Sequence, residues 1–183
     1  MSKIKKIGLF LLPVFMLFIQ FIPLKTVLAE TTDPYYEKIQ QKGELIVGLS
    51  ADYAPYEFHA EIDGKDTIVG FDISIAQKIA DDMGVKLHIE ELGFDALLGA
   101  LKTGKIDLII SGMAVTEERL KEVDFSDTYM TMKQRVIVRK GDADKYKNTL
   151  DFEGVPVGVQ KQTTQEALAQ NELVGSIPTS LQK

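Results

Sequence analysis

The stretch Ile106–Arg119 reads IDLIISGMAVTEER, and it indicates both the fold and the chemistry of this chain. Its first part, Ile106–Ile110, is mostly apolar and predicts a buried strand. A loop of small residues follows and ends at Thr116, which is a favourable N-cap for a helix. The first helical turn would hold two glutamates, which suit the positive end of the helix dipole, and Arg119, which does not.

Arg119 therefore needs a partner at a place where backbone N–H groups already attract anions. A guanidinium group and free N–H groups can together hold an anion such as a carboxylate. The alternative is a solvated surface arginine paired with a neighbouring glutamate. The stretch thus contains a candidate anion site in a strand-to-helix connection.

Residues 1–29 predict a secretory signal peptide. Lysines precede a nearly continuous apolar run, residues 7–21, and Val27–Ala29 provides a suitable cleavage site. Pro13 and Pro23, together with the short apolar core, argue against a permanent membrane span, although an uncleaved anchor remains an alternative.

The composition excludes several kinds of partner and site. Residues 1–29 hold four of the 21 basic residues and no acidic residue, so the rest of the chain carries 17 basic against 27 acidic residues. Such a surface disfavours nucleic acid. With no cysteine, disulfides, thiolate metal sites and a lipid-modified cysteine are excluded. His59 and His88 lie far apart in sequence, and we expect no metal and no cofactor.

The hydrophobic pattern predicts strands and helices that alternate along the chain. Strands are expected at Glu44–Leu49, Lys86–Glu90, Lys105–Ile110, Lys133–Arg139 and Val155–Gln160, and helices at Tyr35–Gln41, Ile73–Met83 with Asp72 as its cap, Asp95–Lys102 and from Thr163 onwards. This order is typical of an α/β domain with a mostly parallel sheet. Ligands of such sheets bind beyond the carboxyl ends of the strands, where the loops Ser50–Phe58, Gly93–Phe94 and Ser111–Arg119 lie.

A second helix start follows the strand Val155–Gln160. Thr163 and Glu166 have the spacing of a capping box, which predicts free N–H groups in the first turn of a helix. The alternative is an ordinary connection between a strand and a helix.

Several motifs together resemble the extracellular solute-binding proteins of polar amino-acid ABC transporters, solute-binding protein family 3. The matching pieces are VGLSADYAPYEF at 47–58, VGFDI at 69–73, FDALL at 94–98, the loop 110–119, VDFSDTY at 123–129, VGVQ at 157–160 and TTQE at 163–166. The order and spacing of these pieces, from about Tyr36 to Leu173, carry the resemblance.

The resemblance implies a periplasmic-binding-protein-like α/β fold, in which two lobes close on one amino acid. Residues 30–133 would form the first lobe, residues 134–139 a hinge strand, and residues 140–183 the start of the second lobe. The return to the first lobe, and the aspartate that pairs with the ligand ammonium, would lie beyond Lys183, so we expect a truncated, incomplete second lobe.

The resemblance also implies a set of ligand contacts. Tyr53 and Phe94 match aromatic positions that sandwich the ligand side chain, although Phe94 as a core residue and Tyr53 as a surface loop residue are the alternatives. Arg119 matches the arginine that clamps the α-carboxylate, and Thr164 matches a hydroxyl and N–H group that complete carboxylate binding.

Three further positions match less fully. Gly112 and Ala114 match loop positions that meet the polar ends of the ligand, but a serine or threonine is common where Ala114 stands. Ser50 stands where relatives selective for basic amino acids often carry an acid, and Asp52 or Glu57 would have to replace it. A burial argument supports such a site, because a zwitterion leaving water needs both charges satisfied.

The resemblance implies that the chain binds an amino acid for an ABC transporter permease, which is either a separate protein or fused to the intact parent. It would act at the outer face of the cytoplasmic membrane, as in Gram-positive bacteria, or in the periplasm. A receptor-type amino-acid-binding domain and a dehydratase-like enzyme on the same fold are the alternatives. We expect no enzyme, since Glu57 and Asp52 have no catalytic partner in the sequence.

We predict that signal peptidase cleaves the exported protein after Ala29, because small residues end the apolar run there. N-terminal sequencing of the secreted form should then begin at Glu30. A secreted form that retains Met1 would contradict cleavage, though not export.

Overall fold

The computed structural model describes residues 33–181. The predicted signal peptide, residues 1–29, lies outside this part. Within residues 33–181, no helix is both long and apolar enough to cross a membrane.

The first sheet has three parallel strands, which confirms the predicted α/β architecture. Strand β1 (Glu44–Leu49) lies between β5 (Lys86–Glu91) and β6 (Leu108–Ile109). As the central strand, β1 buries Leu45, Val47 and Leu49 at 2% exposure or less. The expected third strand is shorter than predicted, since only two residues of 105–110 pair with β1.

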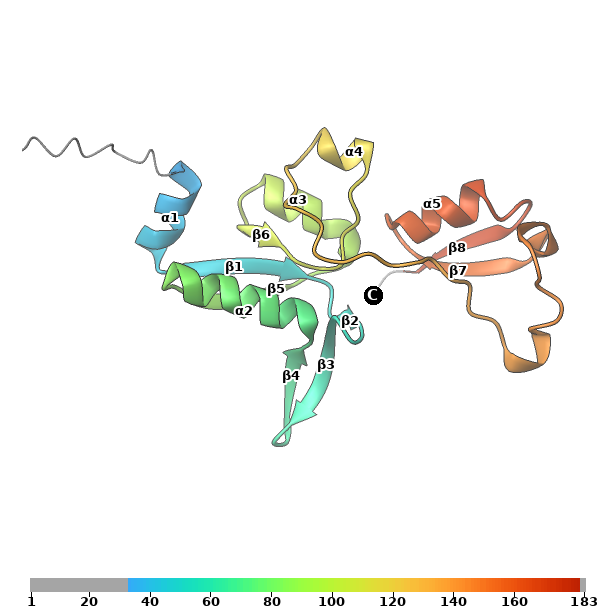
Figure 1. Ribbon diagram of the computed structural model, residues 1–183, viewed down its shortest axis with the longest axis horizontal. Coiled ribbons are helices and arrows are strands. Elements are labelled where there is room, and N and C mark those ends of the chain that lie inside the picture. Colours follow the sequence, from blue (N-terminus) through green and yellow to red (C-terminus); the bar gives the residue numbers. More distant parts are fainter. Residues whose placement is uncertain (1–32, 182–183) are drawn as a thin grey trace, which may run out of the picture. The chain divides into compact units, whose positions relative to one another are not determined.

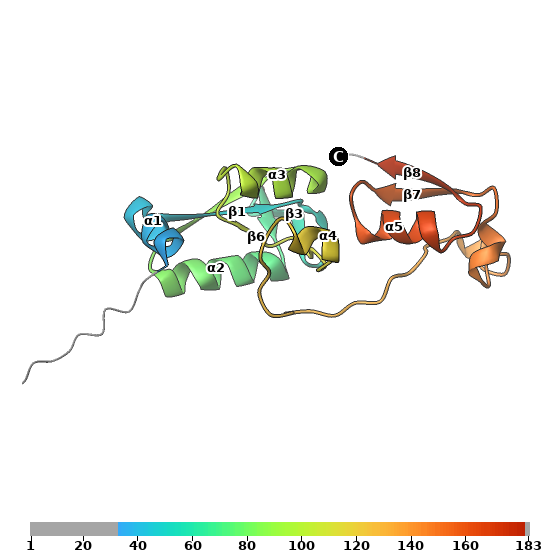
Figure 2. The same cartoon turned by 90° about the horizontal axis from the view of Figure 1, so that it is seen from above.

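Helices cover both faces of this sheet (Figures 1 and 2). Helix α2 (Phe71–Met83) packs Ala76 and Ala80 on one face, together with α1 (Pro34–Lys42). On the other face, the short helix η1 (Phe94–Ala96) leads into α3 (Leu97–Lys102). These helices begin and end close to the predicted residues, because glycines in the left-handed conformation end α1 and α2.

A small antiparallel sheet begins within the region that the sequence predicted as the loop Ser50–Phe58. Strands β2 (Asp52–Tyr53), β3 (Glu57–Ile62) and β4 (Lys65–Val69) form a separate antiparallel sheet. The turn residues Asp63 and Gly64 both have positive φ, which suits a two-residue hairpin turn. The prediction missed these strands because most of β3 and β4 is solvent-exposed and carries no apolar run.

The helix α4 (Glu117–Leu120) begins where the sequence predicted. Thr116 is its N-cap, and the Thr116 side chain accepts a hydrogen bond from the backbone N–H of Arg119. The sequence therefore located this connection correctly.

The expected hinge strand is absent from the structure. Residues 134–139 pair with no strand of residues 33–181, and Ile137 is 95% exposed. A β-branched run has strand propensity, but a strand needs a neighbour for its backbone groups. The division into two lobes around this segment remains a prediction.

A second parallel unit follows two short 3₁₀ helices, η2 (Lys140–Asp142) and η3 (Thr149–Phe152). Strand β7 (Pro156–Gln160), helix α5 (Thr164–Asn171) and strand β8 (Ile177–Leu181) make a βαβ unit. Val159, Ala169 and Leu173 pack with Phe152 in its small core. The sequence did not predict strand β8, because this strand is largely exposed and contains a proline.

We predict that Gly70→Ala destabilises the protein by about 2 kcal/mol or more. Gly70 has φ 136°, and a Cβ there would lie 2.0 Å from the carbonyl oxygen of Tyr56. That carbonyl cannot retreat, because it accepts the backbone N–H of Asp72 at the start of α2. The melting temperature should fall by roughly 4–8 °C.

The matched control is Gly99→Ala, because a Cβ at Gly99 meets no atom within 4 Å. Gly99 lies in a helix, so this change should leave stability unchanged or raise it by up to about 1 kcal/mol. Equal melting temperatures for the two variants would contradict the packing argument.

Candidate functional site

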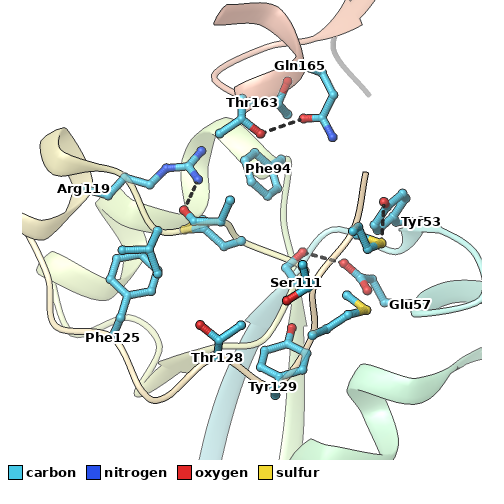
Figure 3. Close-up of a pocket in the computed structure, with 18 of the residues that line it drawn as sticks. Tyr53, Glu57, Phe94, Ser111, Arg119, Phe125, Thr128, Tyr129, Thr163 and Gln165 are labelled. Carbon is cyan, nitrogen blue, oxygen red and sulfur yellow. Dashed lines mark hydrogen bonds between the residues drawn. The ribbon is translucent and has the colours of Figure 1, made fainter. Parts of the chain in front are cut away.

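The loops that follow the strands line a cavity of about 320 Å³. Its walls come from residues 52–57, Phe94, residues 111–119, residues 125–134 and residues 160–165 (Figure 3). Three of these groups follow β1, β5 and β6, as expected for a parallel sheet. The volume lies within the range of sites for small molecules.

Arg119 is the main charged group of this cavity. Its side chain lies against Phe94, with Cζ 5.6 Å from the ring centroid, and the residue is 8% exposed. Nη1 donates to the carbonyl oxygen of Ala114 at 2.6 Å, and Nη2 donates to that of Gln162 at 2.8 Å. The alternative of a solvated surface arginine is therefore wrong.

The partners of Arg119 leave its charge uncompensated. Both hydrogen-bond acceptors are neutral carbonyls, and no carboxylate within residues 33–181 forms an ion pair with it. Burial lowers the pKa of the Arg119 guanidinium, but an arginine side chain stays charged in proteins. A buried cation with this surrounding favours an anionic ligand.

The start of α5 lies on the same cavity. Thr163 caps the helix by accepting the N–H of Glu166 at 3.2 Å, and Thr164 begins it; both threonines line the cavity. The Glu166 carboxylate accepts the N–H of Gln162 and not that of Thr163, so only one of the two hydrogen bonds of the predicted capping box is formed. Free N–H groups at this helix start add to the positive potential near Arg119.

Aromatic side chains line the remaining wall. Phe94 and Tyr53 both face the cavity, as Figure 3 shows. The Tyr53 hydroxyl contacts the sulfur of Met132 at 3.4 Å, and its ring lies 5.2 Å from that of Tyr56. Aromatic faces of this kind suit the apolar stem of a ligand.

Gly112 and Ala114 lie in the cavity wall, but their polar groups are already partly used. The Gly112 N–H donates to Asp72 Oδ2 at 2.9 Å, and the Ala114 carbonyl accepts from Arg119. Gly112 has φ 53°, which favours glycine, and a Cβ there would lie 3.3 Å from Tyr53. Both residues therefore shape the wall, and Ala114 also holds Arg119.

Ser50 is the one predicted site residue that does not line the cavity. It is 1% exposed; its N–H donates to Ser111 Oγ, and its own hydroxyl donates to Asp52 Oδ2, both at 3.0 Å. Its expected direct contact with a ligand is replaced by a supporting contact to Asp52.

Gln160 lines the cavity but was not chosen from the sequence, and Asp52 was named only as a substitute for the acid missing at Ser50. Asp52 lies beside Tyr53 in the same motif, and its Oδ2 also accepts from Gln160 Nε2 at 3.0 Å. Gln160 ends β7, far away in the chain, so no local signal connects the two. Asp72, expected to be a helix cap, is instead fully buried inside α2, whose N-cap is Gly70.

Comparisons with known proteins indicate the family of this chain. Residues 45–180 match the family of bacterial extracellular solute-binding proteins, family 3. An arginine-binding extracellular protein of Bacillus subtilis is 40% identical over 68% of this chain and 47% of its own length. An L-cystine-binding protein of Escherichia coli is 34% identical over 73% of this chain and 50% of its own length.

A solved structure shows the same similarity. An amino acid ABC transporter substrate-binding protein from Streptococcus pneumoniae, bound to L-arginine, superposes with a TM-score of 0.78 at 44% identity. The match covers 80% of this chain and 61% of that one. This chain spans about half the length of the curated relatives described above.

Proposed function

Because the chain belongs to family 3 of the bacterial extracellular solute-binding proteins, we propose that its cavity binds one free amino acid outside the cytoplasm. The bound amino acid would be delivered to the permease of an ABC transporter, either separate or fused to the parent protein. The relatives described above are binding proteins, which supports binding without catalysis.

The observation that carries this proposal is the buried Arg119 with no acidic partner in residues 33–181. An α-carboxylate would accept hydrogen bonds from the guanidinium group and from the start of α5. Both kinds of donor bind carboxylates well, and the guanidinium fork adds geometric selectivity. A buried cation and an anion together cost less than either alone, which favours a ligand with a carboxylate.

We further propose that the ligand is a basic amino acid, with arginine as the first candidate. Asp52 supplies a carboxylate to the cavity wall and is held by Ser50 and Gln160. Figure 3 shows the next residue, Tyr53, on the opposite side of the pocket from Arg119. A cationic side chain that lies between Tyr53 and Phe94 would then reach Asp52.

The named relatives support this choice, since two of the three bind arginine by their descriptions. In this reading, Asp52 takes the place of the acid that is missing at Ser50. Cystine, the ligand named for the Escherichia coli relative, is the second candidate.

We predict that Arg119→Ala weakens binding of L-arginine by about 2–5 kcal/mol, because the carboxylate loses a charged partner out of water. Arg119→Lys should not restore binding, since one ammonium group cannot replace the guanidinium fork. Calorimetry with the wild-type protein and both variants measures the effect. An unchanged dissociation constant in Arg119→Ala would remove this residue from the site.

We predict that Asp52→Asn weakens binding of arginine by about 1–3 kcal/mol and leaves binding of citrulline nearly unchanged. Citrulline has the same length but a neutral head group, so it isolates the charge. The control is Asp124→Asn, an exposed aspartate that does not line the cavity. Equal losses for arginine and citrulline would contradict a cation site at Asp52.

A further inference from the structure

Two carboxyl groups face each other in the interior beside the pocket. Glu57, at the start of β3, is 1% exposed, and Asp72, in the first turn of α2, is 0% exposed. Each group has one oxygen, Glu57 Oε2 and Asp72 Oδ1, with no hydrogen-bond partner among the described residues. Two buried acceptors without a donor are costly in the native state.

A single proton shared by the two carboxyl groups lowers the free-energy cost of burying both of them. Two carboxylates that share a buried site cannot both stay ionised, because like charges repel strongly out of water. If one group is protonated, its O–H can donate to the carboxylate of the other group. The side chains of Glu57 and Asp72 lie close enough for this hydrogen bond.

The hydrogen bonds assign the charge to Asp72 and the proton to Glu57. Asp72 Oδ2 accepts from the Gly112 N–H at 2.9 Å and from the Tyr129 hydroxyl at 3.1 Å. Among the described residues, Glu57 Oε1 accepts only from Ser111 Oγ, at 2.9 Å. More donors stabilise the charged form, so Asp72 is the better anion of the pair.

We propose that Glu57 and Asp72 share one proton, and that the resulting hydrogen bond makes them positioning residues for the pocket wall. The bond joins β3 to α2. Asp72 in turn holds Gly112 in the wall and Tyr129 in the segment that follows α4. The proton also leaves Glu57, which lines the pocket, without a charge.

The surrounding groups favour retention of this proton. Burial first, and then the charge of Asp72, raises the pKa of Glu57 to about 8, and Asp52 of β2 adds to the effect. Burial and Asp72 also raise the pKa of Tyr129, so its hydroxyl stays a donor. The pKa of Tyr53 is raised as well, mainly by burial and to a smaller extent by the charges of Tyr56 and Glu57.

The shift makes stability depend on pH with a definite sign. The folded protein keeps the Glu57 proton up to about pH 8, whereas the unfolded chain loses it near its ordinary pKa of 4.5. The stabilisation is therefore complete below pH 4.5 and falls as pH rises towards 8.

The test compares the wild-type protein with Glu57→Gln and Glu61→Gln. A glutamine amide donates to Asp72 without titrating, whereas Glu61 lies exposed on the same strand and serves as the matched control. Melting temperatures between about pH 5 and pH 9 should fall more steeply for the wild type and Glu61→Gln than for Glu57→Gln. Glu91 and Asp66 raise the pKa of His59. Because His59 is present in all three proteins, its contribution to the pH dependence cancels in the comparison.

Infrared spectroscopy at neutral pH gives a direct second measurement. The wild type and Glu61→Gln should show the carbonyl band of a buried, protonated carboxylic acid, and Glu57→Gln should lack it. If Glu57→Gln does not fold, Asp72→Asn should also lose this band, because the asparagine amide donates to an ionised Glu57.

Absence of this band in the wild type, or parallel pH profiles for the wild type and Glu57→Gln, would overturn the proposal. Neither measurement involves a ligand. A failure of the proposed arginine binding would therefore leave this test intact, and the two failures are distinguishable.

Discussion

A guanidinium group that is held out of water and has no acidic partner in the described part of the chain is the constraint on which this site depends. Within residues 33–181, the guanidinium group of Arg119 donates hydrogen bonds to the carbonyls of Ala114 and Gln162, and both acceptors are neutral. These acceptors orient the group but do not remove its charge. The rest of the cavity is arranged around this requirement, with a helix start near the cation and aromatic rings along the wall. A ligand carboxylate would complete the electrostatics that the protein leaves open.

The parallel sheet explains why the site can form at all. Strands β1, β5 and β6 run in the same direction, so the loops that follow them meet at one edge. Residues that are distant in sequence, such as Tyr53, Phe94 and Arg119, thereby line one cavity. The apolar cores beneath them are formed by α2 on one face and by α3 on the other.

The buried carboxyl pair connects this scaffold to the pocket. Asp72 lies in a helix whose apolar residues belong to the core, while its carboxylate holds Gly112 in the pocket wall. Fold and site thus share a residue, whose Oδ2 accepts hydrogen bonds from the Gly112 N–H and the Tyr129 hydroxyl. Glu57, the other member of the pair, lies at the start of β3 in the hairpin and also lines the cavity.

Local signals determined much of this protein without the structure. The periodicity of Ile73–Met83, the glycine after α1 and the cap at Thr116 each act within a few residues, so helix positions and the location of Arg119 were predictable. Only the tertiary structure decided that Asp72 is buried and that residues 134–139 form no strand. It also decided that Ser50 and Gln160 both donate hydrogen bonds to Asp52. These outcomes depend on neighbours distant in the chain, because burial and strand pairing are properties of contacts and not of residue types.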